Sequence, residues 1–170
     1  SLWFCPRDPA STAMLKYSIT RTPKPRSAAE RAAIFADPGF GKHFTEHMVA
    51  IDWDKDAGWH DAQVRPYGPL SLDPAASVLH YGQEIFEGIK AYRHADGSIW
   101  TFRPEANGER LQNSARRLAL PELPVDEFVQ SLRQLVAVDA DWVPGEPETS
   151  LYFRPFMIAT EAFLGVRAAH

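Results

Sequence analysis

The sequence predicts an α+β fold, a mainly antiparallel β-sheet flanked by helices. Paired runs of alternating apolar and polar residues fill the first part of the chain, and segments with helical spacing follow before a last strand. Strands followed by helices, without regular alternation, are typical of this class. A chain of 170 residues, 45% of them hydrophobic, can form one domain with a real core.

Residues 1–38 are expected to form an extended arm with one short helix, and residues 39–170 the domain itself. Prolines recur through the arm, and only residues 27–35 show a helical pattern, with Ser27 placed to cap it. Cys5 is the single cysteine, so it cannot form an internal disulfide, and we interpret it as an incidental thiol.

Hairpins are predicted from alternation and turn residues. Residues 48–67 alternate on both sides of a polar turn and predict one hairpin. The apolar run at residues 77–81 is interpreted as a further strand. Residues 88–93 and 98–102 flank the turn at residues 94–97, whose Asp-Gly pair is expected to supply the positive φ angles of a tight hairpin.

Two helices and a strand are expected next. Residues 106–120 and 126–139 have helical spacing, and Pro121 stops the first of them. The second carries an apolar stripe, which suits a sheet face. Residues 149–160 are expected to form one long strand.

Charge and hydropathy exclude several partners. The net charge is −4 and the pI is near 5.8, so no basic excess is present to neutralise nucleic acid phosphates. No apolar run approaches the roughly 20 residues that span a bilayer. We therefore expect a cytoplasmic protein without nucleic acid or membrane partners.

Several motifs fail on spacing. Residues 39–42 lack the outer residues of a phosphate-binding loop. His43 and His47 would stand about 13 Å apart on a strand, so we interpret them as exposed strand histidines and expect no metal site. Glu84 and Glu87 have no evident partner for acid–base hydrolysis, and no serine nucleophile motif is present.

Two stretches keep a functional alternative open. Tyr81 and Phe86 lie among glycines, so they either project into a cleft or pack in the core. Arg110 lies in the first turns of a predicted helix, where a guanidinium is unfavourable against the helix dipole unless an anion is bound. Arg110 is therefore either part of a phosphate site or a solvated surface residue.

Taken together, motifs in a fixed order resemble the branched-chain aminotransferases of PLP fold type IV. The matching segments cover the chain from about residue 38 to its last residue, and they are residues 40–48, 79–91, 102–110, 114–118, 138–144, 150–155 and 164–166. The resemblance implies the small α+β domain of such an enzyme.

The resemblance implies roles for residues of a cofactor and substrate site. Arg110 matches the arginine that grips the phosphate of pyridoxal 5'-phosphate (PLP). Phe40, Phe86 and Tyr152 match the apolar pocket that holds a branched aliphatic group. An apolar slot suits Leu, Ile or Val, whose side chains offer only shape and area.

Other matches imply a shared site in a homodimer. Arg154 matches an arginine beside the substrate carboxylate, which is needed because glutamate must share the slot. Tyr81, Leu164 and Val166 match residues that reach into the neighbouring subunit's site. The implied reaction exchanges an amino group between Leu, Ile or Val and 2-oxoglutarate, as in branched-chain amino acid biosynthesis.

One departure concerns the lysine that PLP chemistry requires. The lysines of the chain, none of which matches the family's Schiff-base lysine, are Lys16, Lys24, Lys42, Lys55 and Lys90. That lysine belongs to a large domain absent from this chain, so we expect no catalytic residue here and no transamination by the chain alone.

Three alternatives stay open. The chain could be a non-catalytic fragment that self-associates through apolar surface. It could also belong to another fold-type-IV enzyme, a D-amino acid aminotransferase or an aminodeoxychorismate lyase. The segments at residues 81–90 and 150–155 favour the branched-chain group.

Overall fold

The computed structural model describes residues 14–169 and confirms the α+β class. In chain order the elements are β1 (Ser18–Ile19), α1 (Ala28–Ala36), β2 (His47–Asp54), β3 (Gly58–Pro66), α2 (Ser77–Tyr81), β4 (Glu84–Phe86), β5 (Ile89–Arg93), β6 (Ile99–Thr101), α3 (Pro104–Arg117), α4 (Val125–Val138), the 3-10 helix η1 (Ala140–Trp142), β7 (Leu151–Phe153) and β8 (Phe156–Ile158). Cys5 lies outside the described residues.

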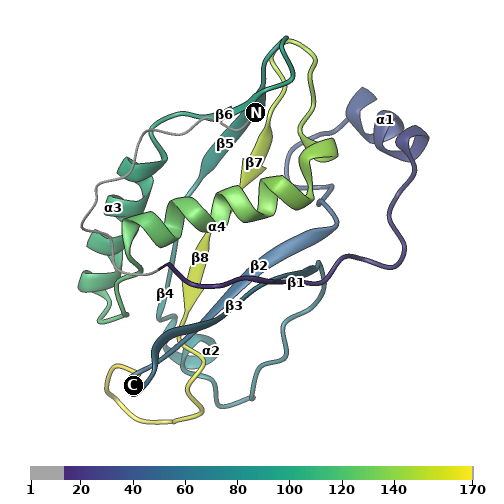
Figure 1. Ribbon diagram of the computed structural model, residues 1–170. Coiled ribbons are helices and arrows are strands. Elements are labelled where there is room, and N and C mark those ends of the chain that lie inside the picture. Colours follow the sequence, from purple (N-terminus) through teal and green to yellow (C-terminus); the bar gives the residue numbers. More distant parts are fainter. Residues whose placement is uncertain (1–13, 170) are drawn as a thin grey trace.

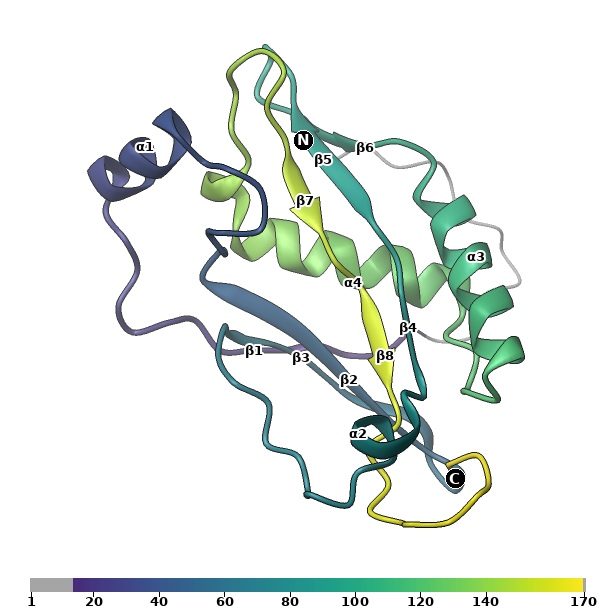
Figure 2. The same ribbon diagram turned by 180° about the vertical axis from the view of Figure 1, so that it is seen from behind.

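Three small sheets replace the expected single sheet in the described chain. Their strand orders are β1-β3-β2, β4-β8 and β6-β5-β7, and every pairing is antiparallel except that of β1 with β3. Helix α4 crosses in front of the strands in Figure 1 and behind them in Figure 2. It therefore covers one face of the sheets, and Figure 2 shows no described helix over β5 and β7 on the other face.

The helix in the arm is confirmed, and its start follows from its sequence. Ser27 caps α1 with a capping box, in which the Ser27 hydroxyl accepts from the Glu30 N–H and the Glu30 carboxylate accepts from the Ser27 N–H at 2.7 Å. Figure 1 shows α1 at the edge of the molecule, with the arm running back along β3. The parallel pairing of β1 with β3 was not predicted.

Both hairpins are confirmed, with one correction to the second turn. β2 pairs with β3, and β5 pairs with β6. Among the described turn residues at 94–97 only Gly97 has a positive φ, of 83°. Asp96 instead accepts hydrogen bonds from the backbone N–H and the hydroxyl of Ser98, at 2.9 and 2.6 Å.

The run at residues 77–81 is a helix, α2, so the predicted strand is wrong. Gly82 ends this helix in the left-handed conformation, with φ of 61°, and its N–H donates to the Val78 carbonyl. A short apolar run does not distinguish a strand from a helical turn by periodicity. The first N–H groups of α2 donate to the carbonyls of Glu161 and Ala159, so α2 lies against the last part of the chain.

The long strand expected at residues 149–160 is also wrong. It is two short strands in different sheets, since β7 pairs with β5 and β8 pairs with β4. Arg154 and Pro155 separate them, and proline has no N–H for a sheet ladder. The Pro155 carbonyl accepts from the Glu87 N–H at 2.8 Å, which ties this break to the segment between β4 and β5.

The core forms where α3 and α4 pack on the sheets. α3 and α4 lie close to the predicted helices, and Phe128, Leu132 and Val136 of the predicted stripe are buried. A Cβ at Gly108 of α3 would stand 3.2 Å from the Phe128 ring, so glycine permits the close approach of the two helices. Within residues 14–169 no helix has the length and apolar content to cross a membrane.

Candidate active site

A buried carboxylate links α3 to the segment between β4 and β5. The Glu87 side chain is 4% exposed and accepts from Arg110 Nε at 2.8 Å and from Arg110 Nη2 at 2.7 Å. Asn107 Nδ2 also donates to Glu87, at 2.9 Å, and to the Gly88 carbonyl at 3.1 Å. Because Asn107 and Arg110 are three residues apart on α3, both side chains reach the same carboxylate.

These contacts keep Glu87 ionised. Burial acts to raise the pKa of Glu87, but hydrogen bonds from Arg110 and Asn107, with the positive charge of Arg110, outweigh it and hold that pKa below its ordinary value. The expectation that Glu87 has no partner is therefore wrong. Arg110 itself stays 65% exposed and lies in the second turn of α3.

Four of the predicted site residues form an aromatic cluster: Phe40, Phe86, Tyr152 and Arg154. The rings of Phe40 and Tyr152 meet edge to face, with centroids 5.1 Å apart. The Arg154 guanidinium lies over Phe86, with Cζ 4.6 Å from the ring centroid, and its Nη2 donates to Tyr152 Oη at 3.1 Å. Phe40 and Phe86 are strongly exposed, so the cluster lines a surface.

An open pocket of about 260 Å³ lies beside this cluster. Its lining residues are Gly88, Ile89, Lys90, Tyr92, Phe102, Asn107 and Tyr152. A Cβ at Gly88 would stand 3.1 Å from Tyr152 Cζ, so the Tyr152 ring lies directly over the glycine backbone. The pocket is therefore apolar on the Tyr152 side and borders the Glu87 network through Gly88 and Asn107.

The other predicted site residues, Tyr81, Leu164 and Val166, lie apart from the pocket lining. Tyr81 ends α2, and the C-terminal segment runs beside that helix through a bridge between Ala76 and Ala162 (Figure 2). Tyr81 and Leu164 are 48% and 63% exposed, and Val166 is fully exposed. These side chains form an outer surface that the described chain leaves uncovered.

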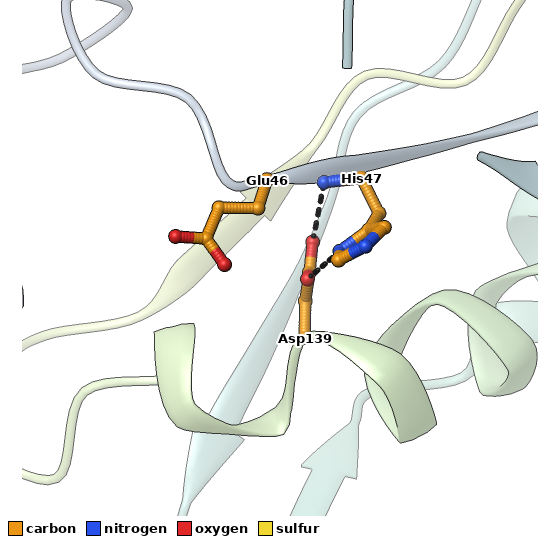
Figure 3. A group of neighbouring side chains, drawn as sticks. All are labelled: Glu46, His47 and Asp139. Carbon is orange, nitrogen blue, oxygen red and sulfur yellow. Dashed lines mark hydrogen bonds and ion pairs between the residues drawn. The ribbon is translucent and has the colours of Figure 1, made fainter. Parts of the chain in front are cut away.

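His47 is buried, which corrects its interpretation as an exposed strand histidine. Its Nδ1 lies 2.6 Å from Asp139 Oδ1, its backbone N–H donates to Asp139 Oδ2, and its Nε2 accepts from the Thr22 N–H at 2.9 Å (Figure 3). Nε2 therefore carries no proton, and Nδ1 donates to Asp139. His43 is exposed, as expected, but it precedes β2 and lies outside the strand.

The ligand atoms of Glu46, His47 and Asp139 lie within 4.8 Å of one another, as metal ligands could. Protein groups already use them, since both ring nitrogens of His47 are hydrogen-bonded and Glu46 accepts the Arg26 N–H. We therefore interpret this group as a structural link between the arm, β2 and the end of α4.

Sequence reasoning missed Glu87, Asn107 and Gly88 as parts of this site. The spacing of Asn107 and Arg110 on one helix face was a usable signal for a shared acceptor. Nothing in the spacing identified Glu87 as that acceptor, because it lies 23 residues from Arg110 and on another element.

Known proteins with similar sequences have one description in common. The chain is 62% identical over 157 residues to a branched-chain-amino-acid aminotransferase of Mycolicibacterium smegmatis, which covers 92% of this chain and 43% of that protein. It is 47% identical over 156 residues to branched-chain-amino-acid aminotransferase 2 of Bacillus subtilis, covering 92% of this chain and 41% of that protein. The chain is a homologue of the branched-chain aminotransferases. It spans less than half the length of these relatives.

Solved structures agree with this relationship. The branched-chain amino acid aminotransferase of Escherichia coli has a TM-score of 0.51 and 25% identity, covering 62% of this chain and 33% of that chain. A second branched-chain amino acid aminotransferase, from the source abbreviated T.th. and solved with pyridoxamine 5'-phosphate, has a TM-score of 0.51 and 26% identity, covering 70% of this chain and 35% of that chain. No family model matches the chain.

Proposed function

We propose that this chain is the small α+β domain of a PLP-dependent branched-chain aminotransferase. The enzyme would exchange an amino group between Leu, Ile or Val and 2-oxoglutarate. The observation that carries the proposal is 62% identity to a relative of that name over 92% of the chain. Because the chain spans 43% of that relative, the activity belongs to a longer protein whose other part carries the PLP lysine.

The residues of the site fit the phosphate of PLP. Glu87 engages Nε and Nη2 of Arg110, so within the described chain Nη1 remains available to an anion, on a side chain that is 65% exposed. When bound, PLP supplies the electron sink for transamination. Arg110 would hold its phosphate, and no residue of this chain is proposed to act as the acid or base.

The aromatic cluster suits both substrates. Phe40, Phe86 and Tyr152 offer apolar surface for a branched side chain, whose recognition depends on shape and area. The Arg154 guanidinium lies over Phe86 and contacts Tyr152 Oη, so a carboxylate entering the same space meets a positive charge. This pairing is what an enzyme that accepts both leucine and glutamate requires.

We further propose a cytoplasmic homodimer with sites shared between subunits, acting on small amino acids and 2-oxo acids. The exposure of Tyr81, Leu164 and Val166 supports their roles at the neighbouring subunit's site. Exposed apolar side chains on both the cluster and this outer surface also favour self-association of the isolated chain, the non-catalytic alternative.

The test uses the full-length protein that contains this chain, reconstituted with PLP. Formation of branched 2-oxo acids from L-Leu, L-Ile and L-Val with 2-oxoglutarate supports the proposal, and the isolated chain is expected to give none. Turnover of D-Ala without L-Leu would indicate a D-amino acid aminotransferase instead. Release of pyruvate from aminodeoxychorismate would indicate the lyase.

A further inference from the structure

We propose that Glu87 is a positioning residue for Arg110: it holds one edge of the guanidinium so that the remaining N–H groups face the phosphate. The inference rests on the proposed function, which supplies that phosphate. It assigns to a buried carboxylate, which touches neither cofactor nor substrate, control over how tightly the phosphate is held.

The geometry fixes the orientation of the guanidinium. Arg110 donates to Glu87 through Nε and Nη2, at 2.8 and 2.7 Å, and the group is planar with five N–H donors. A planar group that is bound along one edge presents its other donors in one direction. The Nη1 donors and the second Nη2 donor therefore point away from Glu87, on a side chain that is 65% exposed.

The carboxylate is itself anchored from several sides. The Glu87 side chain is 4% exposed, its Oε2 also accepts from Asn107 at 2.9 Å, and its backbone N–H donates to the Pro155 carbonyl at 2.8 Å. Glu87 therefore cannot follow Arg110 into solvent. The pair is an anchor with a mobile partner, and the anchor is the carboxylate.

Another ion pair of α3 shows the contrast. Arg116 contacts Glu122 with side chains that are 53% and 40% exposed, as in ordinary surface ion pairs, which contribute little. The asymmetry of 4% against 65% at Glu87 and Arg110 is different, because only the carboxylate is removed from water. Glu122→Gln, which removes the partner of another α3 arginine, is therefore a matched control.

The charge of Glu87 acts against its position. A carboxylate beside Arg110 lowers the positive potential that a phosphate meets, so a purely electrostatic view predicts tighter PLP binding in Glu87→Gln. Positioning predicts the opposite result. An amide at residue 87 directs N–H donors at a donor group, so the guanidinium loses its fixed orientation.

The experiment measures the dissociation constants of PLP and of pyridoxal, which lacks the phosphate, in the apo form of the full-length protein. Glu87→Gln is expected to weaken PLP binding about tenfold, the size of a coupled charged network. Pyridoxal binding should stay within about twofold, since no phosphate contact is lost. In an Arg110→Ala background, Glu87→Gln should leave PLP binding unchanged, and Glu122→Gln should leave it unchanged in either background.

Several results would overturn the inference. Tighter or unchanged PLP binding in Glu87→Gln refutes positioning, and so does an equal loss for PLP and pyridoxal, which indicates a general structural role. A loss that persists in the Arg110→Ala background shows that Glu87 does not act through Arg110. If Glu87→Gln does not fold, Glu87→Asp decides, since its shorter carboxylate should lower the ratio of PLP to pyridoxal affinity.

The failure of the proposed function is distinct. A wild-type protein that binds neither PLP nor pyridoxal refutes the aminotransferase assignment and this inference with it. A wild-type protein that binds PLP normally, with the Glu87 variants unaffected, refutes only the inference.

Discussion

Gly88→Ala is expected to reshape the pocket through a single methyl group. The new Cβ would stand 3.1 Å from Tyr152 Cζ and 3.3 Å from Cε2, and closer still to the hydroxyl oxygen. The φ angle of Gly88 is not positive, so alanine fits the backbone there and the effect is steric. The Tyr152 ring has to move.

The size of the effect follows from what holds Tyr152. The ring contacts Phe40 at 5.1 Å between centroids, and Oη accepts from Arg154 at 3.1 Å. Overpacking in proteins costs about 1–3 kcal/mol, and Tyr152 is only half-buried, so we expect a value near the lower end, about 1 kcal/mol. The loss of substrate contact is expected to be larger, about tenfold in kcat/KM for L-Leu.

The assay measures kcat/KM for L-Leu and the thermal unfolding of the full-length protein. Gly68→Ala is the matched control, because a Cβ there meets nothing within 4 Å and no positive φ is required. Tyr152→Phe removes the nearest atom, so in that background Gly88→Ala should cost less than in the wild type. Wild-type stability and kcat/KM in Gly88→Ala would refute the view that Tyr152 lies on Gly88 and forms the wall of the pocket.

Other predictions concern the charged and aromatic side chains. Arg110→Ala should weaken PLP retention during dialysis by about tenfold or more, the value of a charge-assisted phosphate contact, and unchanged retention would sink the phosphate role. Phe86→Ala should lower kcat/KM for L-Leu and L-Ile more than for L-Glu, whereas an equal loss for all three would count against an apolar pocket at Phe86. Because the pKa of Glu87 is lowered in the folded state, its stabilisation is complete above the ordinary pKa of 4.5 and is lost as the pH falls through the folded value. Acid unfolding curves should therefore show less pH dependence in Glu87→Gln than in the wild type below that value, and parallel curves would contradict the ion pair.

Much of the fold could be predicted because it depends on local signals. The capping box at Ser27, the turn at Gly97 and the apolar stripe of α4 each act within a few residues. Errors arose where distant partners decide the structure. Residues 77–81 form a helical turn held by the carbonyls of Ala159 and Glu161, and Pro155 divides one apolar run between two sheets.

The site was predictable to a different extent. Phe40, Phe86, Tyr152 and Arg154 meet in the structure, although the sequence related them only through a family resemblance. The burial of a charged residue is not visible in spacing, so Glu87 was missed.

His47 shows the same difficulty. Its burial depends on Asp139 at the end of α4 and on Thr22 in the arm, neither of which lies near it in the sequence.

The most direct test of the central claim is to map the lysine that bonds to PLP in the full-length protein. Borohydride reduction after incubation with PLP, followed by digestion and mass spectrometry, identifies the modified residue. The proposed function predicts a single adduct on a lysine outside these 170 residues. An adduct on a lysine of this chain, such as Lys90 in the pocket lining, or no adduct at all, would contradict it.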